Sequence, residues 1–219
     1  DLKENYDLQS IRNPYLGRNY TDEQISKQLK HFCKHYPIKL NERELIENTA
    51  NLLSEGKLIA WYQGGAEFGP RALGARSFLA DPRNDAIRDK INTKIKKREL
   101  FRPFAPSIIE EETENFFQLK QKSPYMNIVS NVKNDLIPAT THIDGTARVH
   151  SVSETSHKRY HSLIKRFFEK TGIPVLLNTS FNIQEPIVYS PSDAIKTFIT
   201  SDVDVLVIGD YIITRKDLK

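Results

Sequence analysis

The stretch Leu58-Ile-Ala-Trp-Tyr-Gln-Gly-Gly-Ala-Glu-Phe-Gly-Pro-Arg-Ala-Leu-Gly-Ala-Arg76 joins a short apolar run to a loop rich in glycine. The apolar run, residues 58–62, lies between turn residues and predicts a buried strand. The glycines that follow it let the backbone approach a ligand closely, and Arg71 and Arg76 add cations to the same loop. Ligands of α/β proteins usually bind at the carboxyl ends of strands, so this stretch predicts such a protein with an anion site here.

A second basic segment, Lys96-Lys-Arg-Glu-Leu-Phe-Arg-Pro-Phe-Ala-Pro-Ser107, follows further along the chain. From Glu67 to Phe104 there are ten Lys/Arg and five Asp/Glu, a local charge of +5 in a chain of net charge +4. Arginine suits phosphate because its planar guanidinium donates two parallel hydrogen bonds. The concentrated charge favours an anionic ligand over a general basic coat for DNA. For Lys90, Lys94 and Lys97, a solvated helix face is an equal alternative.

Helical and extended patterns alternate along the rest of the chain. Apolar spacing and capping residues predict helices over 21–35, 41–56, 84–96, 157–170 and 191–200, and strands over 58–62, 77–80, 106–109, 146–152, 174–177 and 203–214. This order predicts an α/β or α+β domain with a largely buried sheet. Residues 111–145 carry no clear pattern. Residues 1–20 have no period and are interpreted as a connector or arm.

Two further segments offer polar groups to a ligand. Asn178-Thr-Ser-Phe-Asn182 follows a buried strand, and its side chains can meet a ribose, a phosphate or a small amide. A turn capped by Asn and Ser is an equal alternative. Arg148 and Thr146 share one face of the strand 146–152, and an inward Arg148 needs an anionic partner. An outward, solvated Arg148 is the alternative.

Several function classes are disfavoured. His31 and His35 share a helix face, but a zinc site needs at least three protein ligands, so we expect no metal there. The chain has neither a G-x-x-x-x-G-K-[ST] phosphate loop nor a G-x-S-x-G nucleophile motif. No apolar run reaches the roughly 18 residues of a membrane helix, which predicts no membrane association. The single Cys33 fits a reducing compartment, so we expect a cytoplasmic protein.

At the level of motifs, the chain resembles the C-terminal, YrdC-like domain of the NodU/CmcH/TobZ-type carbamoyltransferases. The matching segments are Glu67 to Ser77, Leu79 to Arg83, Lys96 to Ser107, Thr141 to Arg148, Thr171 to Asn182 and Glu185 to Val188. They occur in the expected order. The resemblance implies a YrdC-like domain over residues 41–219, with a twisted mixed sheet flanked by helices, and a connector or arm to an N-terminal domain over residues 1–40. The sequence departs from the pattern at Gln184, where the family usually has Gly, and at Val149-His150, where Pro-Gln is common.

The resemblance implies an activity and a partner. Such domains convert carbamoyl phosphate and ATP, with Mg²⁺ on the nucleotide, into carbamoyl-adenylate and pyrophosphate. An N-terminal domain with an actin-like ATPase fold then passes the carbamoyl group to a hydroxyl acceptor. That domain is the implied partner, and a homodimer is left open. The alternative is a YrdC-like domain that binds RNA or nucleotide without catalysis, although the few aromatics near the basic segment disfavour nucleic acid.

The resemblance also implies roles for individual residues. Lys96, Arg102, Arg148 and Ser180 are implied as catalytic. Substrate or nucleotide contacts are expected from Arg71, Arg76, Arg98, Thr146, Asn178, Thr179 and Asn182, with Arg71 or Arg76 completing the anion cage. Two anions meet when a carbamoyl oxygen attacks the α-phosphorus, so cations must screen their repulsion.

Overall fold

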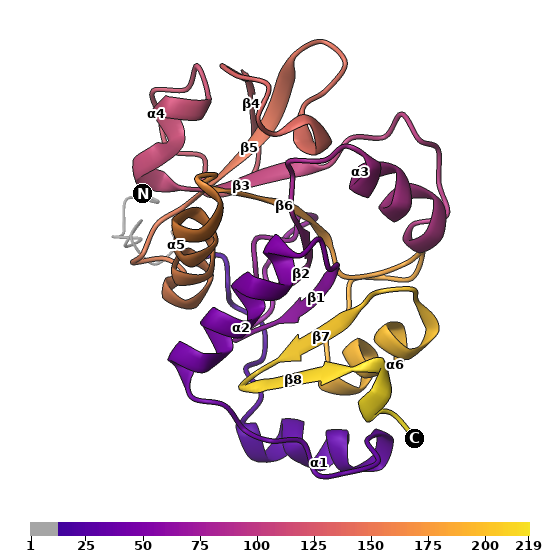
Figure 1. Cartoon of the computed structure of the whole chain (residues 1–219). Coiled ribbons are helices and arrows are strands. Elements are labelled where there is room, and N and C mark those ends of the chain that lie inside the picture. The colour runs from indigo at the N-terminus through magenta and orange to yellow at the C-terminus, as the bar shows by residue number, and fades with distance from the viewer. Residues whose placement is uncertain (1–12) are drawn as a thin grey trace, which may run out of the picture.

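The computed structural model describes residues 13–219, which form one mixed sheet covered by helices (Figure 1). The strands are β1 (Ile59–Tyr62), β2 (Arg76–Ala80), β3 (Ala105–Ile109), β4 (Ile128–Asn131), β5 (Thr146–Val152), β6 (Val175–Ser180), β7 (Val205–Ile208) and β8 (Tyr211–Thr214). The helices are α1 (Asp22–Phe32), α2 (Glu42–Ser54), α3 (Ala86–Lys90), α4 (Thr113–Phe116), α5 (Lys158–Thr171) and α6 (Pro191–Thr200). The strand order is β4-β5-β3-β6-β2-β1-β7-β8. Only β1–β7 and β3–β5 pair in parallel, so the predicted mixed sheet is confirmed.

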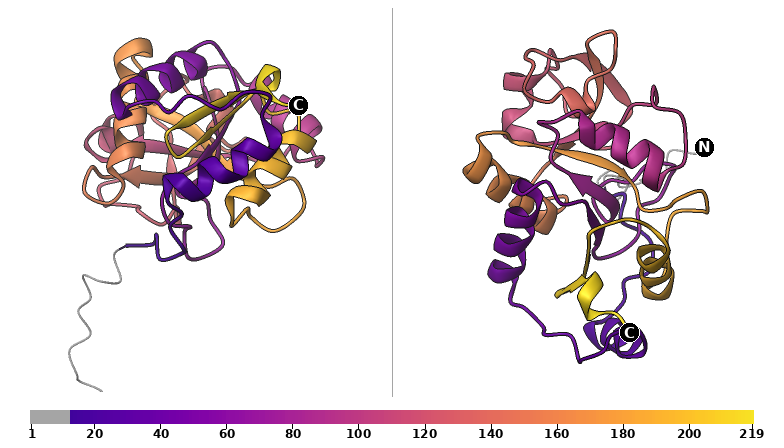
Figure 2. Two further views of the ribbon diagram at one scale, coloured as in Figure 1. Left: turned by 90° about the horizontal axis from the view of Figure 1, so that it is seen from below. Right: turned by 45° about the vertical axis from the view of Figure 1, so that its right-hand side comes forward.

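The strands alternate apolar side chains between two layers, because successive residues of a strand point to opposite faces. Trp61 and Leu79 pack with α2 and α5 on one face. Tyr62 and Phe78 pack with α1 and α6 on the other. Two further views show α2 and α5 together and α6 apart from them (Figure 2). Burial on both faces explains why β1 reads as an unbroken apolar run.

The ends of the main helices follow from local hydrogen bonds. Thr21 and Asn41 each cap a helix, and in both cases the residue three positions later reaches back to close a capping box. Gly172 ends α5 in the left-handed conformation, at φ 74°. These three boundaries are the ones that the sequence predicts.

The segment between residues 13 and 40 packs onto the domain. Ile25 and Leu29 of α1, together with Cys33, lie in the apolar layer under α6. The backbone N–H of Leu40 donates to the carbonyl of Asp210. The division of the chain at residue 40 stays a prediction, but the described part of the predicted connector contributes to the core.

Two elements differ from the sequence prediction in ways that shape the site. The helix predicted over 84–96 is the short α3 followed by a π-helical turn, Ile91–Ile95. The N–H of Lys96 there donates to the carbonyl of Ile91, five residues back. The strand predicted to end at residue 177 continues as β6 to Ser180, so Asn178 pairs with Leu79 and Ala105 in the sheet. The unassigned residues 111–145 contain α4 and β4.

Candidate active site

A cavity of about 820 Å³ lies where β6 ends and β3 and β5 begin. Its lining includes Arg71, Lys96, Lys97, Arg98, Arg102 and Arg148, against a single carboxylate, Glu99. It also includes Asn178, Thr179, Ser180 and Asn182 from the end of β6 and the loop after it. The volume suits a nucleotide-sized ligand. Two of the residues implied as ligand contacts, Arg76 and Thr146, do not line it.

Lys96 lies at the centre of this arrangement, with only 4% of its surface exposed. Its Nζ donates to the carbonyl and the hydroxyl of Ser180, at 2.6 and 3.1 Å. It also donates to the carbonyl and the side-chain Oδ1 of Asn182, both at 2.8 Å. Burial, with Arg98 and Arg102 nearby, lowers the pKa of Lys96 to about 7. The Lys96 ammonium therefore loses its proton more readily than an exposed lysine does.

Asn92, a residue that sequence reasoning missed, shapes the basic loop after the π-helical turn. Its Nδ2 donates to the carbonyls of Leu100 and Arg102, at 3.2 and 2.9 Å. Its Oδ1 accepts from Nε of Arg98 at 2.8 Å, and the Arg98 guanidinium lies 4.8 Å from the Phe104 ring centroid. Burial and the charge of Arg102 lower the pKa of Arg98 to about 10. An Asn within a helical pattern needs hydrogen-bond partners when it is buried, and this is the sequence signal that points to its contacts with the loop.

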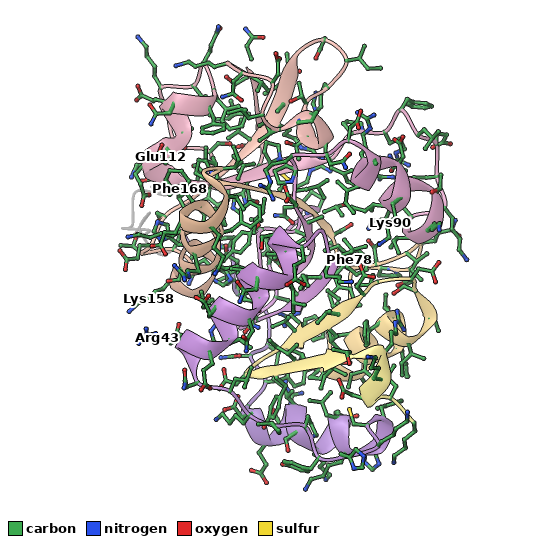
Figure 3. The ribbon with its side chains drawn as sticks, in the orientation of Figure 1. Arg43, Phe78, Lys90, Glu112, Lys158 and Phe168 are labelled. Atoms are coloured by element: carbon green, nitrogen blue, oxygen red, sulfur yellow. The ribbon has the colours of Figure 1, made fainter. Side chains whose placement is uncertain are left out.

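The three lysines for which the sequence equally allows a solvated helix face have different surroundings in the structure. Lys94 is exposed, as that alternative expects. Lys90 forms an ion pair with Asp204 at 3.2 Å, and Lys97 is exposed on the cavity rim with a left-handed φ of 47°. Figure 3 labels Lys90 on α3 and Phe168 on α5, which lie on either side of the central strands. Of the three, only Lys97 adds charge to the cavity.

The resemblance implies that Arg71 or Arg76 completes the anion cage, and the structure separates the two. Arg71 is exposed on the cavity lining, whereas Arg76 is fully buried. Nη1 of Arg76 donates to the carbonyl of Gln63 at 2.9 Å, Nη2 donates to that of Gly64 at 3.0 Å, and the guanidinium stacks 3.6 Å from the Tyr62 ring centroid. It therefore holds the turn after β1, because β2 begins at Arg76 and directs this side chain beneath the loop.

Thr146 is also away from the cavity. Its hydroxyl donates to Oδ1 of Asp144 at 2.7 Å and lies 3.0 Å from Nδ1 of His142. It closes the turn before β5 and so orients the strand that carries Arg148.

The side chain of Glu67 holds the glycine-rich loop through hydrogen bonds to its backbone. One carboxylate oxygen, Oε1, accepts the backbone N–H groups of Leu73, Ala75 and Arg76, at 2.8, 2.7 and 3.0 Å. A carboxylate that accepts three backbone donors fixes the path of the chain. The neighbouring Arg71 is thereby held at the cavity without itself being buried.

This separation predicts opposite results for two matched arginine variants. Arg76→Ala leaves buried carbonyls without donors and should lower the free energy of unfolding by about 3 kcal/mol or more. Arg71→Ala should leave that quantity unchanged and weaken the binding of ATP about 10-fold. Urea titration and calorimetry measure the two effects. An Arg76→Ala chain of unchanged stability with weakened ATP binding would restore Arg76 to the anion cage.

Among residues 13–219, no group of three His, Cys, Asp or Glu side chains gathers in a way that could hold a metal ion. The absence of a metal at His31 and His35 stays a prediction. Within the same residues, no helix is both long and apolar enough to cross a membrane.

Comparison with known proteins identifies the family. Residues 50–215 match the family described as "Carbamoyltransferase C-terminus". The chain is 45% identical over 210 residues to Nodulation protein NolNO of Sinorhizobium fredii, covering 93% of this chain and 30% of that protein. It is 36% identical over 163 residues to the 3'-hydroxymethylcephem-O-carbamoyltransferase of Streptomyces clavuligerus, covering 74% of this chain and 31% of the enzyme. The chain thus spans about a third of the length of the curated relatives it matches.

The fold has a solved counterpart. The crystal structure of P. abyssi Sua5 complexed with L-threonine superposes with a TM-score of 0.58 at 16% identity, covering 80% of this chain and 49% of that one. At this identity the likeness concerns the fold, and it confirms the predicted YrdC-like architecture. On the match of residues 50–215 to the family model and the 45% identity to NolNO, the chain belongs to the carbamoyltransferase C-terminal family.

Proposed function

We propose that this chain forms carbamoyl-adenylate and pyrophosphate from carbamoyl phosphate and ATP. The observation that carries the proposal is the cavity itself, in which one nearly buried lysine and a surround of arginines meet the polar end of β6. The family relatives named as carbamoyltransferases support the carbamoyl substrate.

The reaction must join two anions. Water first cleaves carbamoyl phosphate to carbamate and inorganic phosphate. A carbamate oxygen then forms a bond to the α-phosphorus of ATP, the bond from that phosphorus to the bridging oxygen breaks, and pyrophosphate leaves with the electron pair. Lys96, Arg102 and Arg148 are assigned to screen the repulsion and to stabilise the charge that develops at the phosphorus. Ser180 and Asn182 hold the Lys96 ammonium in place.

Mg²⁺ is expected with the nucleotide, and the cavity fits an ion that arrives on the phosphates. Glu99 is the one carboxylate of its lining, so the described residues form no protein cage for a metal. Mg²⁺ usually binds through one or two carboxylates, substrate phosphates and water. Bound there, it would neutralise phosphate charge, while Arg98 and Arg102 supply the fixed cations.

Transfer to the final acceptor is assigned to a partner domain. This chain corresponds to about a third of its relatives, so an N-terminal transferase domain is the proposed partner. The reactive carbamoyl-adenylate needs shielding from water until transfer. The 219-residue chain alone should therefore release AMP and pyrophosphate slowly and carbamoylate no hydroxyl.

The test is pyrophosphate release by the chain with ATP, Mg²⁺ and labelled carbamoyl phosphate. Release that requires carbamoyl phosphate is the expected result. Arg102→Ala removes an exposed phosphate contact and should weaken ATP binding about 10- to 150-fold. Arg43→Ala is the matched control, because Arg43 is an exposed arginine on α2, outside the cavity lining (Figure 3).

Two outcomes would contradict the proposal. A folded chain that binds ATP but never releases pyrophosphate would be a nucleotide-binding domain without catalysis. Binding of double-stranded RNA that weakens steeply with salt, in the absence of turnover, would favour the nucleic-acid alternative.

A further inference from the structure

Among residues 13–219, five buried side-chain polar atoms have no hydrogen-bond partner, and two of the five belong to residues that line the cavity. These two are Nε of Arg148 and Oδ1 of Asn178. Both residues line the cavity. Buried polar atoms in folded proteins are nearly always paired, so an unpaired donor and an unpaired acceptor in one cavity indicate a ligand that supplies both partners.

The sheet places these two residues in one row. Asn178 of β6 pairs with Ala105 of β3. On the other side of β3, β5 runs parallel, and Ser107 pairs with His150. Two residues earlier in both strands, the same register brings Arg148 beside Ala105. Residues paired across neighbouring strands project to the same face, so Arg148 and Asn178 flank the small Ala105 side chain on one face of the sheet.

The orientation of the Asn178 amide is fixed by its own donor group. Nδ2 donates to the carbonyl of Ala72 at 3.0 Å and to the hydroxyl of Ser107 at 2.9 Å. A carbonyl can only accept, so the atom beside Ala72 must be the NH₂ group and Oδ1 must be the free acceptor. Ser107 is itself held by Nδ1 of the buried His150 at 2.8 Å. Burial and the nearby His157 lower the pKa of His150 to about 3, so this support stays uncharged.

We propose that Asn178 Oδ1 and Arg148 Nε together recognise the H₂N–C=O unit of the carbamoyl group. Asn178 accepts an N–H of the carbamoyl nitrogen, and Arg148 donates to its oxygen. This selects a carbamoyl group over an acetyl group of the same shape, because a methyl group in place of the nitrogen leaves Oδ1 buried and unpaired. The assignment deepens the proposed function and rests on it, and it makes Asn178 a specificity-determining residue.

The test compares two stable phosphonates that differ only in this group. Phosphonoacetamide carries an NH₂ where 2-oxopropylphosphonate carries a methyl group, and both have the same phosphonate. Calorimetry on the chain with ATP and Mg²⁺ should give a Kd for phosphonoacetamide about 10- to 100-fold lower than for 2-oxopropylphosphonate. This measurement needs neither turnover nor a variant.

Asn178→Ala should abolish that preference by weakening phosphonoacetamide alone, with the Kd of ATP unchanged. Asn131→Ala is the matched control, because Asn131 is an exposed strand asparagine on β4. Equal affinity of the wild-type chain for both phosphonates would overturn the role of Asn178 while leaving adenylate formation testable by pyrophosphate release. Binding of neither phosphonate would overturn the carbamoyl site as a whole. Equal weakening of both phosphonates and ATP in Asn178→Ala would show a merely structural residue.

Discussion

Lys96→Met is expected to lower kcat/KM for pyrophosphate release by about 10³-fold. Lys96 is the nearly buried cation of the cavity, and its ammonium joins the end of β6 to the loop that carries Asn182. Methionine keeps the length of the side chain and removes the charge. The loss should therefore appear in catalysis and phosphate binding, with far-ultraviolet circular dichroism unchanged. Steady-state kinetics with ATP and carbamoyl phosphate measure it.

The same lysine predicts a pH dependence. Its pKa in the ligand-free chain is lowered to about 7 by burial and by Arg98 and Arg102. The protonated form binds phosphate, so a bound anion raises that pKa and binding takes up a proton. Affinity for carbamoyl phosphate should consequently fall as pH rises above about 7, by up to about tenfold per unit. Lys96→Met should lose most of this slope. A wild-type affinity that stays constant between pH 7 and 9 would contradict the role of Lys96 as the titrating cation.

Gly74→Ala is expected to destabilise the chain by about 3–5 kcal/mol, which lowers Tm by roughly 10 °C. Gly74 has φ 95°, and a Cβ built there would lie 2.1 Å from Cδ1 of the fully buried Tyr160. The carbonyl of Gly74 also accepts a hydrogen bond from Nε1 of Trp61 at 2.8 Å, so the turn cannot move away from Tyr160 freely. Differential scanning calorimetry measures the shift.

Gly56→Ala separates the clash from the backbone strain. Gly56 also has a left-handed φ, 78°, but a Cβ there meets nothing within 4 Å. Gly56→Ala should therefore lower the free energy of unfolding by only about 1–2 kcal/mol. Equal losses of stability in the two variants would mean that the Tyr160 side chain moves away from the new methyl group with no cost in free energy.

The sequence is sufficient to predict the main elements of the fold because their signals are local. The capping residues Thr21 and Asn41 start helices, and the apolar run of β1 requires burial on both faces. Residues 111–145 carry no such periodicity, because β4 is largely exposed and α4 spans a single turn. The π-helical turn before Lys96 was also missed, since a shift of one residue within a helix leaves no signature in composition.

For the site, the type of a residue helps to predict its role, but its neighbours in the sequence do not show where the fold places its side chain. Glycine-rich context suggested the same role for Arg71 and Arg76, but strand β2 begins at Arg76 and turns that side chain inward. Asn92 contacts the backbone of Arg102 across the basic loop, and Ser107 contacts Asn178 of a strand far along the chain. No sequence spacing shows these contacts. Nothing in the sequence near His150 indicates its role, and only the register of β5 against β3 shows that it supports Ser107.

The position of β6 has a consequence for synthesis of the chain. This strand is the sixth in sequence, but it lies in the middle of the sheet between β3 and β2. Until residues 175–180 leave the ribosome, the apolar strands β2 and β3 each keep one unpaired edge, which exposes the nascent chain to aggregation and to chaperones. Pairing across such sequence distances is also slow. Residues 178–180 of this strand also line the ligand cavity, so the segment that pairs the open edges of β2 and β3 contributes to the site as well.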